Sequence, residues 1–402
     1  MSHLHMSTAG ESHGPAEICT LSGVPAGLAL TAADIDVELA RRSSGYGRGG
    51  RMGIEADRAR ILAGVRLGKT LGSPITILVE NRDHKNWLPS MSVEPVSAET
   101  ARDIRPLTVP RPGHADFAGA AKFGHPDIRN VLERASARET VARVAGGAVC
   151  KRLLAEAGVT IRGRVVRIGE VALAEQQHTD PQGIDWEAVE GSDVACEDPA
   201  TAEAMRMAIE KARDAGESLG GVFEIWCWGV CPGLGSYVTA EERLDALFMW
   251  ALGSVPGVKG VEIGAGFSQA ALPGSRVHDP FVLADSWERP VIARSSNNAG
   301  GLEGGVTNGM PLVLRAAMKP IPTLRRPLGS VDMASLAPVA AHVERSDVAA
   351  VPAARVVGEA MVAYVLARAY LAKFGGDSLA HFLGAVGAYE EELKERGLWR
   401  RS

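Results

Sequence analysis

Two long helical patterns, one in the first half of the chain and one near its end, constrain the fold more than any other feature of the sequence. The first spans roughly 136–157 and the second roughly 353–373, and both repeat apolar residues at helical spacing. The second starts after Pro352 and stops at a glycine pair, Gly375 and Gly376. Strand-like segments lie at 74–80, 221–228, 258–264 and 311–318. The sequence therefore predicts a mixed α and β fold, but it leaves the order of strands in a sheet open.

Composition excludes several classes of protein. The 402 residues are 46% hydrophobic and 23% charged, which is typical of a globular protein and not of a disordered or collagen-like chain. No uninterrupted apolar run of about 18 residues is present, and the segment Met1–Met6 lacks the basic-then-apolar layout of a signal peptide. We therefore expect a cytoplasmic protein with no membrane partner.

The cysteines indicate neither disulfides nor a metal site. Five of them are scattered along the chain, an odd number with no framework spacing. Cys227 and Cys231 are one residue too far apart for a Cys-x-x-Cys motif, and no second pair follows. We expect no bound metal.

The net charge of -5 is unevenly distributed. The stretch from Glu170 to Glu203 holds ten acidic residues and no Lys or Arg, which leaves 43 basic against 38 acidic residues elsewhere. We interpret 171–200 as an acidic, turn-rich surface segment. Of the basic residues 34 are arginine, the side chain suited to binding phosphate and carboxylate groups. A small anionic ligand is the first interpretation, although high genomic G+C content would also favour arginine.

Two histidines lie in turns rich in glycine and proline. His13 lies within Ala9–Pro15, and His114 lies within Arg111–Asp116. Such turns present an imidazole at the edge of an element, where it can donate or accept a proton near pH 7. The alternative for each is an ordinary surface histidine.

Two arginine clusters are candidate anion sites. Segment 41–52 holds four arginines and four glycines, so guanidinium groups lie on a backbone that a ligand can approach closely. An RNA-binding Arg-Gly-Gly tract is the alternative, but such tracts repeat, and this one occurs once in a chain with a pI of about 6.1. In segment 134–139, Ser136 and Glu139 have capping-box spacing, which predicts a helix N-terminus beside Arg134 and Arg138. The alternative there is an ordinary capped helix.

A glycine-rich stretch is the last candidate site. Five of the ten residues 300–309 are glycine, and the stretch leads into a strand that ends at 319–323. It would suit a flat cofactor that bears a phosphate, or a flexible surface loop. Two nucleotide-binding patterns are incomplete, and we interpret both as turns. The phosphate-loop pattern at 63–70 lacks the helix that must follow it, and the dinucleotide pattern at 264–267 lacks its third glycine.

Together these motifs resemble one family, chorismate synthase. The similarity covers nearly the whole chain, in the order 10–14, 45–49, 111–116, 134–139, 258–264, the glycine-rich loop, 345–347 and 350–352. The resemblance implies an α+β fold, a β-α-β sandwich with helices between antiparallel sheets, formed as a single domain over 1–402. It also implies a homotetramer.

The resemblance further implies a lyase of the shikimate pathway. Enzymes of this family convert 5-enolpyruvylshikimate 3-phosphate into chorismate and phosphate by anti-1,4-elimination, and they need reduced flavin mononucleotide (FMN) although the reaction is redox-neutral. No additional dinucleotide-binding domain is visible, so we expect an external flavin reductase, with NADPH as an indirect reductant.

The resemblance also assigns residues. His13 is similar to the acid beside the departing phosphate, His114 to the histidine near N1 of the flavin, and Asp347 to a residue that helps the flavin N5 take the C6 proton. The matching substrate-binding positions are Arg42, Arg48, Arg51, Arg134 and Arg138. The matching flavin-binding positions are Arg134, Ala135, Ser136, Pro256, Gly257, Gly304, Lys319, Pro320, Ile321, Pro322, Thr323 and Arg345.

The sequence departs from the family pattern at three places. Segment Met1–Ser7 differs from the usual start, Ala135 replaces a common serine, and Pro256–Gly257 replaces a position that is often polar. We expect the last two to change flavin affinity more than activity. Two rival functions remain open: a non-catalytic binder of phosphorylated metabolites, and a nucleic-acid module built on 41–52.

Overall fold

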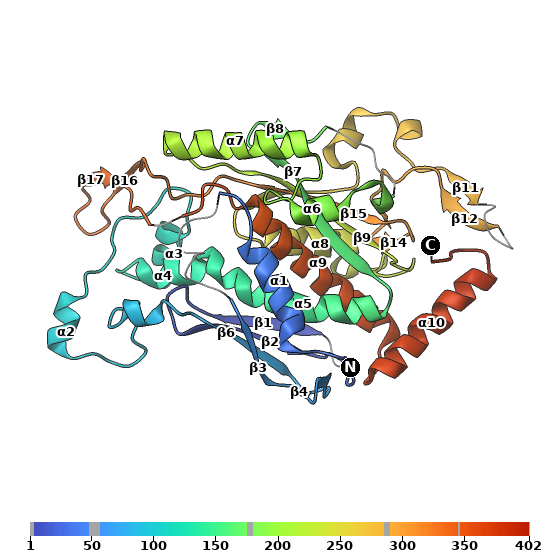
Figure 1. The fold of residues 1–402 in the computed structure, drawn as a ribbon, viewed down its shortest axis with the longest axis horizontal. Coiled ribbons are helices and arrows are strands. Elements are labelled where there is room, and N and C mark those ends of the chain that lie inside the picture. The colour runs from blue at the N-terminus through green and yellow to red at the C-terminus, as the bar shows by residue number, and fades with distance from the viewer. Residues whose placement is uncertain (1–3, 48–56, 175–179, 285–289, 345, 402) are drawn as a thin grey trace.

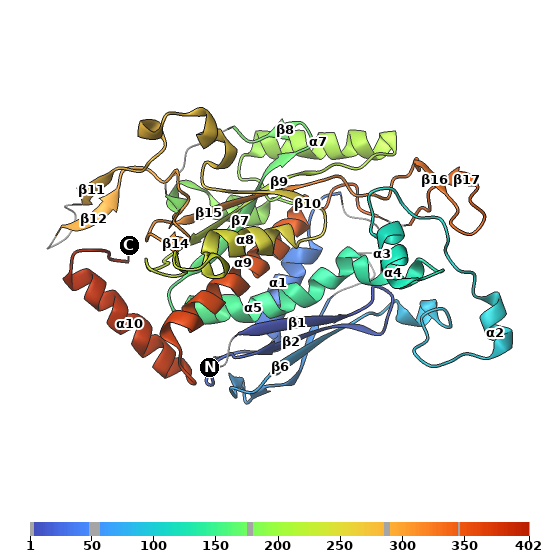
Figure 2. The ribbon, with the colours of Figure 1, turned by 180° about the vertical axis from the view of Figure 1, so that it is seen from behind.

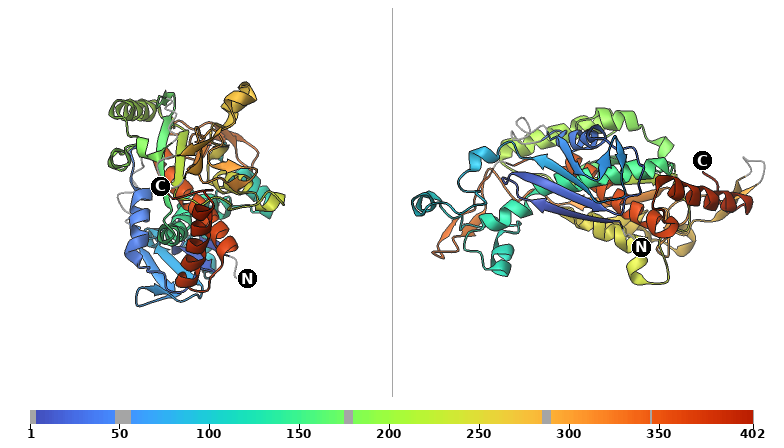
Figure 3. Two further views of the ribbon diagram at one scale, coloured as in Figure 1. Left: turned by 90° about the vertical axis from the view of Figure 1, so that its right-hand side faces the viewer. Right: turned by 90° about the horizontal axis from the view of Figure 1, so that it is seen from below.

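The fold consists of two antiparallel sheets with helices packed between them (Figures 1 and 3). The computed structural model describes residues 4–47, 57–174, 180–284, 290–344 and 346–401. One sheet has the strand order β1-β2-β6-β3 and the other β10-β15-β9-β7-β8. The α+β sandwich expected from the resemblance is confirmed.

The strands of the two sheets come from different stretches of the chain, the first sheet from residues 5–80 and the second from residues 160–318. The first sheet contains β1 (His5–Gly10), β2 (Ala16–Ser22), β3 (Ala59–Ala63) and β6 (Ile75–Glu80). The second contains β7 (Thr160–Ile168), β8 (Val171–Ala172), β9 (Gly221–Trp228), β10 (Val258–Ile263) and β15 (Leu312–Met318). Two-stranded hairpins are formed by β4 (Val65–Arg66) with β5 (Lys69–Thr70), β11 (Phe281–Ala284) with β12 (Val291–Arg294), β13 (Leu302–Glu303) with β14 (Val306–Thr307), and β16 (Gly329–Val331) with β17 (Pro338–Ala340).

Helices form the middle layer, the outer cover and the two ends of the molecule (Figure 2). The middle layer consists of α1 (Ala32–Ser43), α5 (Thr140–Glu156) and α9 (Val351–Phe374). The other helices are α2 (Ala98–Asp103), α3 (Asp116–Phe123), α4 (Arg129–Ala135), α6 (Trp186–Gly191), α7 (Pro199–Ala215), α8 (Leu244–Gly253) and α10 (Leu379–Glu395). Two short 3-10 helices, η2 (His84–Trp87) and η3 (Ala137–Glu139), lie beside the candidate site.

Two adjacent glycines let α5 lie close to the first sheet and to the neighbouring helix α9. A Cβ on Gly146 would lie 2.4 Å from the sulfur of Met6, on the first sheet. A Cβ on Gly147 would lie 2.3 Å from the Cβ of Ala360, on α9. Of the 24 residues of α9, 18 are buried, as expected for a helix enclosed on all sides. The small residues therefore determine how closely the central helices pack.

Most of the predicted elements form where they were expected. The four predicted strands correspond to β6, β9, β10 and β15, and the later helical pattern corresponds to α9, which ends at Gly375. The earlier pattern begins with the short helix η3, and the α-helix proper starts at Thr140. The predicted helix N-terminus is confirmed, because Ser136 is the N-cap of η3 and its hydroxyl accepts from the backbone N–H of Arg138. The Glu139 half of the predicted capping box is wrong, because the Glu139 carboxylate binds Thr8 and Arg143 instead. The Glu139 carboxylate accepts from Thr8 on strand β1, so it does not cap the backbone N–H of Ser136.

Several other segments also have defined positions. Segment 63–70 contains the β4–β5 hairpin, and the glycine-rich stretch contains the β13–β14 hairpin. Within the acidic stretch, described residues form α6, whose Trp186 and Val189 are buried. All five cysteines are buried as free thiols. Among the described residues, every helix is too short or too polar to cross a bilayer.

Candidate active site

His13 is held by a buried carboxylate from a distant part of the chain. Its Nδ1 lies 2.9 and 3.0 Å from the two carboxylate oxygens of Glu133, on α4, and its backbone N–H donates to the same group at 2.8 Å. Although burial opposes ionisation of Glu133, the hydrogen bonds and charge of His13, with the charge of Arg129, hold the pKa of this carboxyl below its usual value. A carboxylate accepts hydrogen bonds only, so the proton on the neutral imidazole lies on Nδ1.

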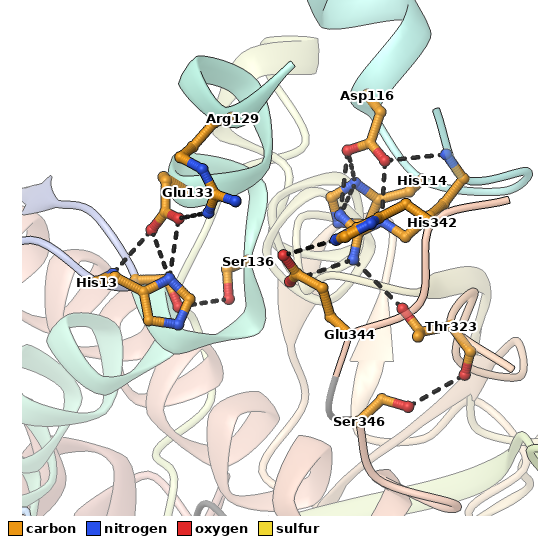
Figure 4. Close-up of polar contacts among 12 residues, drawn as sticks. His13, His114, Asp116, Arg129, Glu133, Ser136, Thr323, His342, Glu344 and Ser346 are labelled. Carbon is orange, nitrogen blue, oxygen red and sulfur yellow. Dashed lines mark hydrogen bonds and ion pairs between the residues drawn. The ribbon is translucent and has the colours of Figure 1, made fainter. Parts of the chain in front are cut away.

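An aromatic ring covers one face of the same histidine. Trp87, on η2, stacks on His13 with ring centroids 3.6 Å apart, and the guanidinium of Arg129 lies 5.0 Å from the centre of the Trp87 ring. The backbone carbonyl of His13 is 2.9 Å from Nδ1 of His84, also on η2. Contacts from two elements, α4 and η2, therefore fix the imidazole. Figure 4 shows the contact from Glu133 on α4, together with Arg129.

Two of the predicted substrate-binding arginines converge on one aspartate. Arg42, at the end of α1, and Arg138, on η3, both approach Asp57, at 3.5 and 2.7 Å. Arg42 also donates to the Thr140 hydroxyl, and Arg138 donates to the side chain of Asn81 at 2.8 Å. Both arginines are buried. They are fixed by the protein itself before any ligand binds.

Arg134 lies at the more exposed edge of the site. Its guanidinium donates to the backbone carbonyls of Thr8 and Gly10, on β1. It also borders a cavity of about 410 Å³ whose wall includes Glu139 and Tyr364. The Ser136 hydroxyl, two residues further on, hydrogen-bonds the hydroxyl of Ser12, the neighbour of His13.

His114 is the centre of a second cluster. Its Nδ1 is 2.5 Å from Oδ1 of Asp116, and Arg111 donates to the same carboxylate through Nε at 2.9 Å. Burial favours the neutral acid, but the hydrogen bonds from His114 and Arg111 outweigh it and hold the pKa of Asp116 well below its usual value. Glu344 lies 3.8 Å from Arg111 and 3.3 Å from Nε2 of His342 (Figure 4).

The predicted flavin-binding segment 319–323 lies against this second cluster. The ammonium of Lys319 donates to the carbonyl of Gly113, and Arg111 donates to the Thr323 hydroxyl at 3.3 Å. Burial, helped by the charge of Lys259, lowers the pKa of Lys319. The backbone N–H of Lys319 donates to the carbonyl of Gly257 at 2.9 Å, so the predicted pair Pro256–Gly257 lies here as well.

Of the remaining predicted residues, Gly304 lies apart from these clusters and three are not described. Gly304 lies in the β13–β14 hairpin, where the neighbouring Gly305 accepts from the first residue of α8. Pro256 and Gly257 follow the other end of this ten-residue helix, which is about 15 Å long. Within one chain, Gly304 and this pair are therefore separated by the length of α8. Asp347 follows Ser346, whose hydroxyl donates to the carbonyl of Thr323 at 3.1 Å. It precedes Val348, whose N–H donates to the carbonyl of Gly47. Arg48, Arg51 and Arg345 lie outside the described residues.

Several residues at the site were missed by sequence reasoning. Glu133 directly precedes the recognised segment 134–139 but is not part of it, and 120 positions separate it from His13. Trp87 and Asp57 belong to no motif that was singled out. Asp116 was part of a recognised motif, and its spacing of two residues from His114 was a signal that a paired carboxylate was present. Within the described ranges, the structure contains no group of three or more metal-ligating side chains suited to hold an ion.

Comparison with known proteins decides the family. The family model described as chorismate synthase matches residues 4–371. The chain belongs to the chorismate synthase family. Its function is that of a chorismate synthase, a carbon–oxygen lyase of the shikimate pathway for aromatic amino-acid biosynthesis.

Relatives within the chorismate synthase family align over nearly their full length. The chain is 55% identical over 391 residues to the chorismate synthase of Desulforudis audaxviator, covering 97% of this chain and 98% of the relative. It is 53% identical over 396 residues to that of Moorella thermoacetica, covering 98% and 100%. A crystal structure of chorismate synthase superimposes with a TM-score of 0.79 at 40% identity, covering 98% of this chain and 99% of that one.

Proposed function

We propose that the clusters around His13 and His114 form the catalytic centre of this chorismate synthase and act on 5-enolpyruvylshikimate 3-phosphate. The observation that supports this proposal most directly is the hydrogen bond from Nδ1 of His13 to the Glu133 carboxylate. Because Nδ1 is engaged in this way, Nε2 is the atom that carries the exchanged proton. In this role His13 protonates the phosphate as its C–O bond breaks, which lowers the negative charge that develops on the leaving group.

The arginines neutralise and orient the substrate. The substrate carries a phosphate and two carboxylates, so its binding needs several positive charges at fixed positions. Arg42 and Arg138 are fixed by Asp57, and Arg134 lies at the exposed edge beside a cavity. We assign substrate binding to these three side chains and, as a proposal from the sequence alone, to Arg48 and Arg51.

The residues present fit reduced FMN. A half-buried lysine, Lys319, and a buried threonine hydroxyl, Thr323, both contact the turn that carries His114, and they form a donor set suited to a phosphate. The neighbouring His114 is oriented by Asp116. We propose that these residues, with Arg134, Ala135, Ser136 and Pro256–Gly257, hold the flavin. Reduced FMN, when bound, supplies electron density to the allylic system of the substrate.

Gly304 and Arg345 are proposed flavin contacts from sequence similarity. Because Gly304 is separated from Pro256–Gly257 within one chain, we propose that it meets the flavin of another subunit in a homotetramer. Asp347 is proposed to relay the proton that leaves C6. We further propose that the protein acts in the cytoplasm and that an external reductase, using NADPH, supplies the reduced flavin.

An anaerobic assay tests this function. The full-length protein is incubated with chemically reduced FMN and 5-enolpyruvylshikimate 3-phosphate, and the release of phosphate and chorismate is followed. Stoichiometric formation of both products is expected. Folded protein that forms neither product would refute the proposal. Repeating the assay with NADPH and oxidised FMN tests the source of electrons: no turnover is expected until a flavin reductase is added.

A further inference from the structure

Glu17 is a buried carboxyl group in an otherwise apolar position. It lies on β2, where the inward-facing residues alternate, and the next two inward positions are Cys19 and Leu21. The residue is 1% exposed, and neither of its carboxyl oxygens has a hydrogen-bond partner in the described part of the chain. An ionised carboxylate in such a place is unfavourable unless a charge nearby compensates it.

The position of Glu17 connects it to the proposed anion site. The β1–β2 register pairs Glu17 with Gly10, and a Cβ on Gly10 would lie only 2.5 Å from Oε2 of Glu17. The carbonyl of Gly10 accepts from Arg134 at 3.2 Å. The carboxyl of Glu17 therefore lies directly behind the turn that carries His13, and only a glycine at position 10 leaves room for it.

Four charged groups in the described part of the chain act on Glu17. Arg138 and Arg134 favour its ionised form, while Glu139 and Glu11 oppose it. Burial is the largest effect, and together these influences raise the pKa of Glu17 to about 7. About half of the molecules therefore carry a proton on Glu17 at neutral pH. Among the described residues, these two arginines supply the attraction that favours the ionised form of Glu17. Any ligand that neutralises their charge therefore makes that form less favourable.

We propose that Glu17 is a positioning residue that couples the binding of anionic ligands at Arg134 and Arg138 to the uptake of one proton. Without a ligand, the charges of the two arginines favour the ionised carboxyl of Glu17. When a phosphate or carboxylate of the ligand binds, it neutralises the arginines and repels Glu17, which takes a proton from solvent. By linkage, ligand affinity falls as the pH rises above the range in which Glu17 is protonated. This inference rests on the proposed function, because that function supplies the anionic ligands.

Calorimetry measures the proton directly. The full-length protein at pH 7 is titrated with oxidised FMN, and the FMN complex is then titrated with 5-enolpyruvylshikimate 3-phosphate. Each titration is run in two buffers of different ionisation enthalpy. We expect uptake of about 0.5 proton in at least one of the titrations, because about half of the Glu17 carboxyls are ionised beforehand. Absence of proton uptake by the wild-type protein in both titrations would overturn the proposal without any variant.

The variant Glu17→Gln identifies the group responsible. It keeps the shape of the side chain and cannot ionise, so its proton uptake should be lower than that of the wild type by about 0.5. Between pH 6 and pH 8 the wild-type Kd should rise about tenfold relative to that of Glu17→Gln. Titration of the phosphate on each ligand affects both proteins equally and cancels in this comparison. The matched control is Glu80→Gln, at the exposed end of the neighbouring strand β6, which should behave as wild type.

The outcomes separate this inference from the proposed function. If the wild type binds neither ligand and forms no product, the proposed function is wrong. If it binds and turns over normally, but Glu17→Gln shows the same proton uptake and the same dependence of Kd on pH, only the role of Glu17 is wrong. A purely structural role would change stability but leave the pH dependence of Kd unaltered.

Discussion

Replacing Glu133 with glutamine tests how His13 is prepared for acid catalysis. The carboxylate accepts from Nδ1 at 2.9 and 3.0 Å and from the backbone N–H of His13 at 2.8 Å. Glutamine retains one carbonyl acceptor but loses the negative charge. A hydrogen bond to a charged group contributes about 1.5–3 kcal/mol and a neutral one about 0.5–1.5 kcal/mol, so the protonated imidazole loses about 1–2 kcal/mol of stabilisation.

This loss has a definite kinetic consequence. Since about 1.4 kcal/mol corresponds to one pH unit, the pH at which kcat/KM declines on the alkaline side should fall by about one unit in Glu133→Gln. The measurement is anaerobic kcat/KM with reduced FMN from pH 5.5 to 9. The matched control is Arg129→Gln, which removes a partner of Glu133 at 3.1 Å but keeps the contact with His13, and it should shift the profile less. An unchanged alkaline limb in Glu133→Gln, or one moved upward, would refute this account.

Three further predictions concern the core and the second histidine. Gly147→Ala should lower the free energy of unfolding by about 1–3 kcal/mol, measured by urea denaturation, because its methyl group would overlap α9. An unchanged urea concentration at the unfolding midpoint would contradict this packing. Glu359 is fully buried and binds Arg41 at 2.7 Å and Lys151 at 2.9 Å; although burial opposes its ionisation, these charges hold its pKa far below the usual value. Glu359→Gln should therefore lower the free energy of unfolding by about 3–5 kcal/mol at pH 7. Because the ion pairs stabilise the wild type only while the carboxyl is ionised, the difference in stability between wild type and variant should become smaller as the pH falls below about 4. His114→Ala should lower kcat far more than it weakens substrate binding, and equal losses in both would indicate a binding role only.

Local patterns were sufficient for the secondary structure that has clear boundaries. The helix α9 begins beside Pro352 and ends at Gly375, so residue types with restricted or unusual backbone conformations mark both of its ends. The predicted strands form because their apolar residues fit a pleated surface. The start of α5 was predicted less well, because Glu139 is drawn to Thr8 and Arg143, and neither interaction with a distant residue is visible in a capping motif.

The candidate site was predictable only where its residues lie in compact turns. His13 and His114 belong to short turns of glycine, proline and charged residues, and Arg134 and Arg138 flank a serine that can cap a helix. Such short motifs can be recognised without knowledge of the rest of the fold. The carboxylates that contact these residues could not be predicted in this way, because they depend on tertiary packing. Glu133 reaches His13 only because α4 packs beside the turn after β1, and Asp57 meets Arg42 and Arg138 only because α1 and η3 converge.

The sequence by itself therefore determined the elements, the turns and the kinds of chemistry that they carry, because these depend on backbone preferences and side-chain types over a few residues. The tertiary structure alone decided which carboxylate orients each histidine, which arginines are fixed in advance, and that Glu17 is enclosed beside them. Burial and electrostatic coupling arise from contacts between segments far apart in the chain. Those contacts exist only after the two sheets have closed over the central helices.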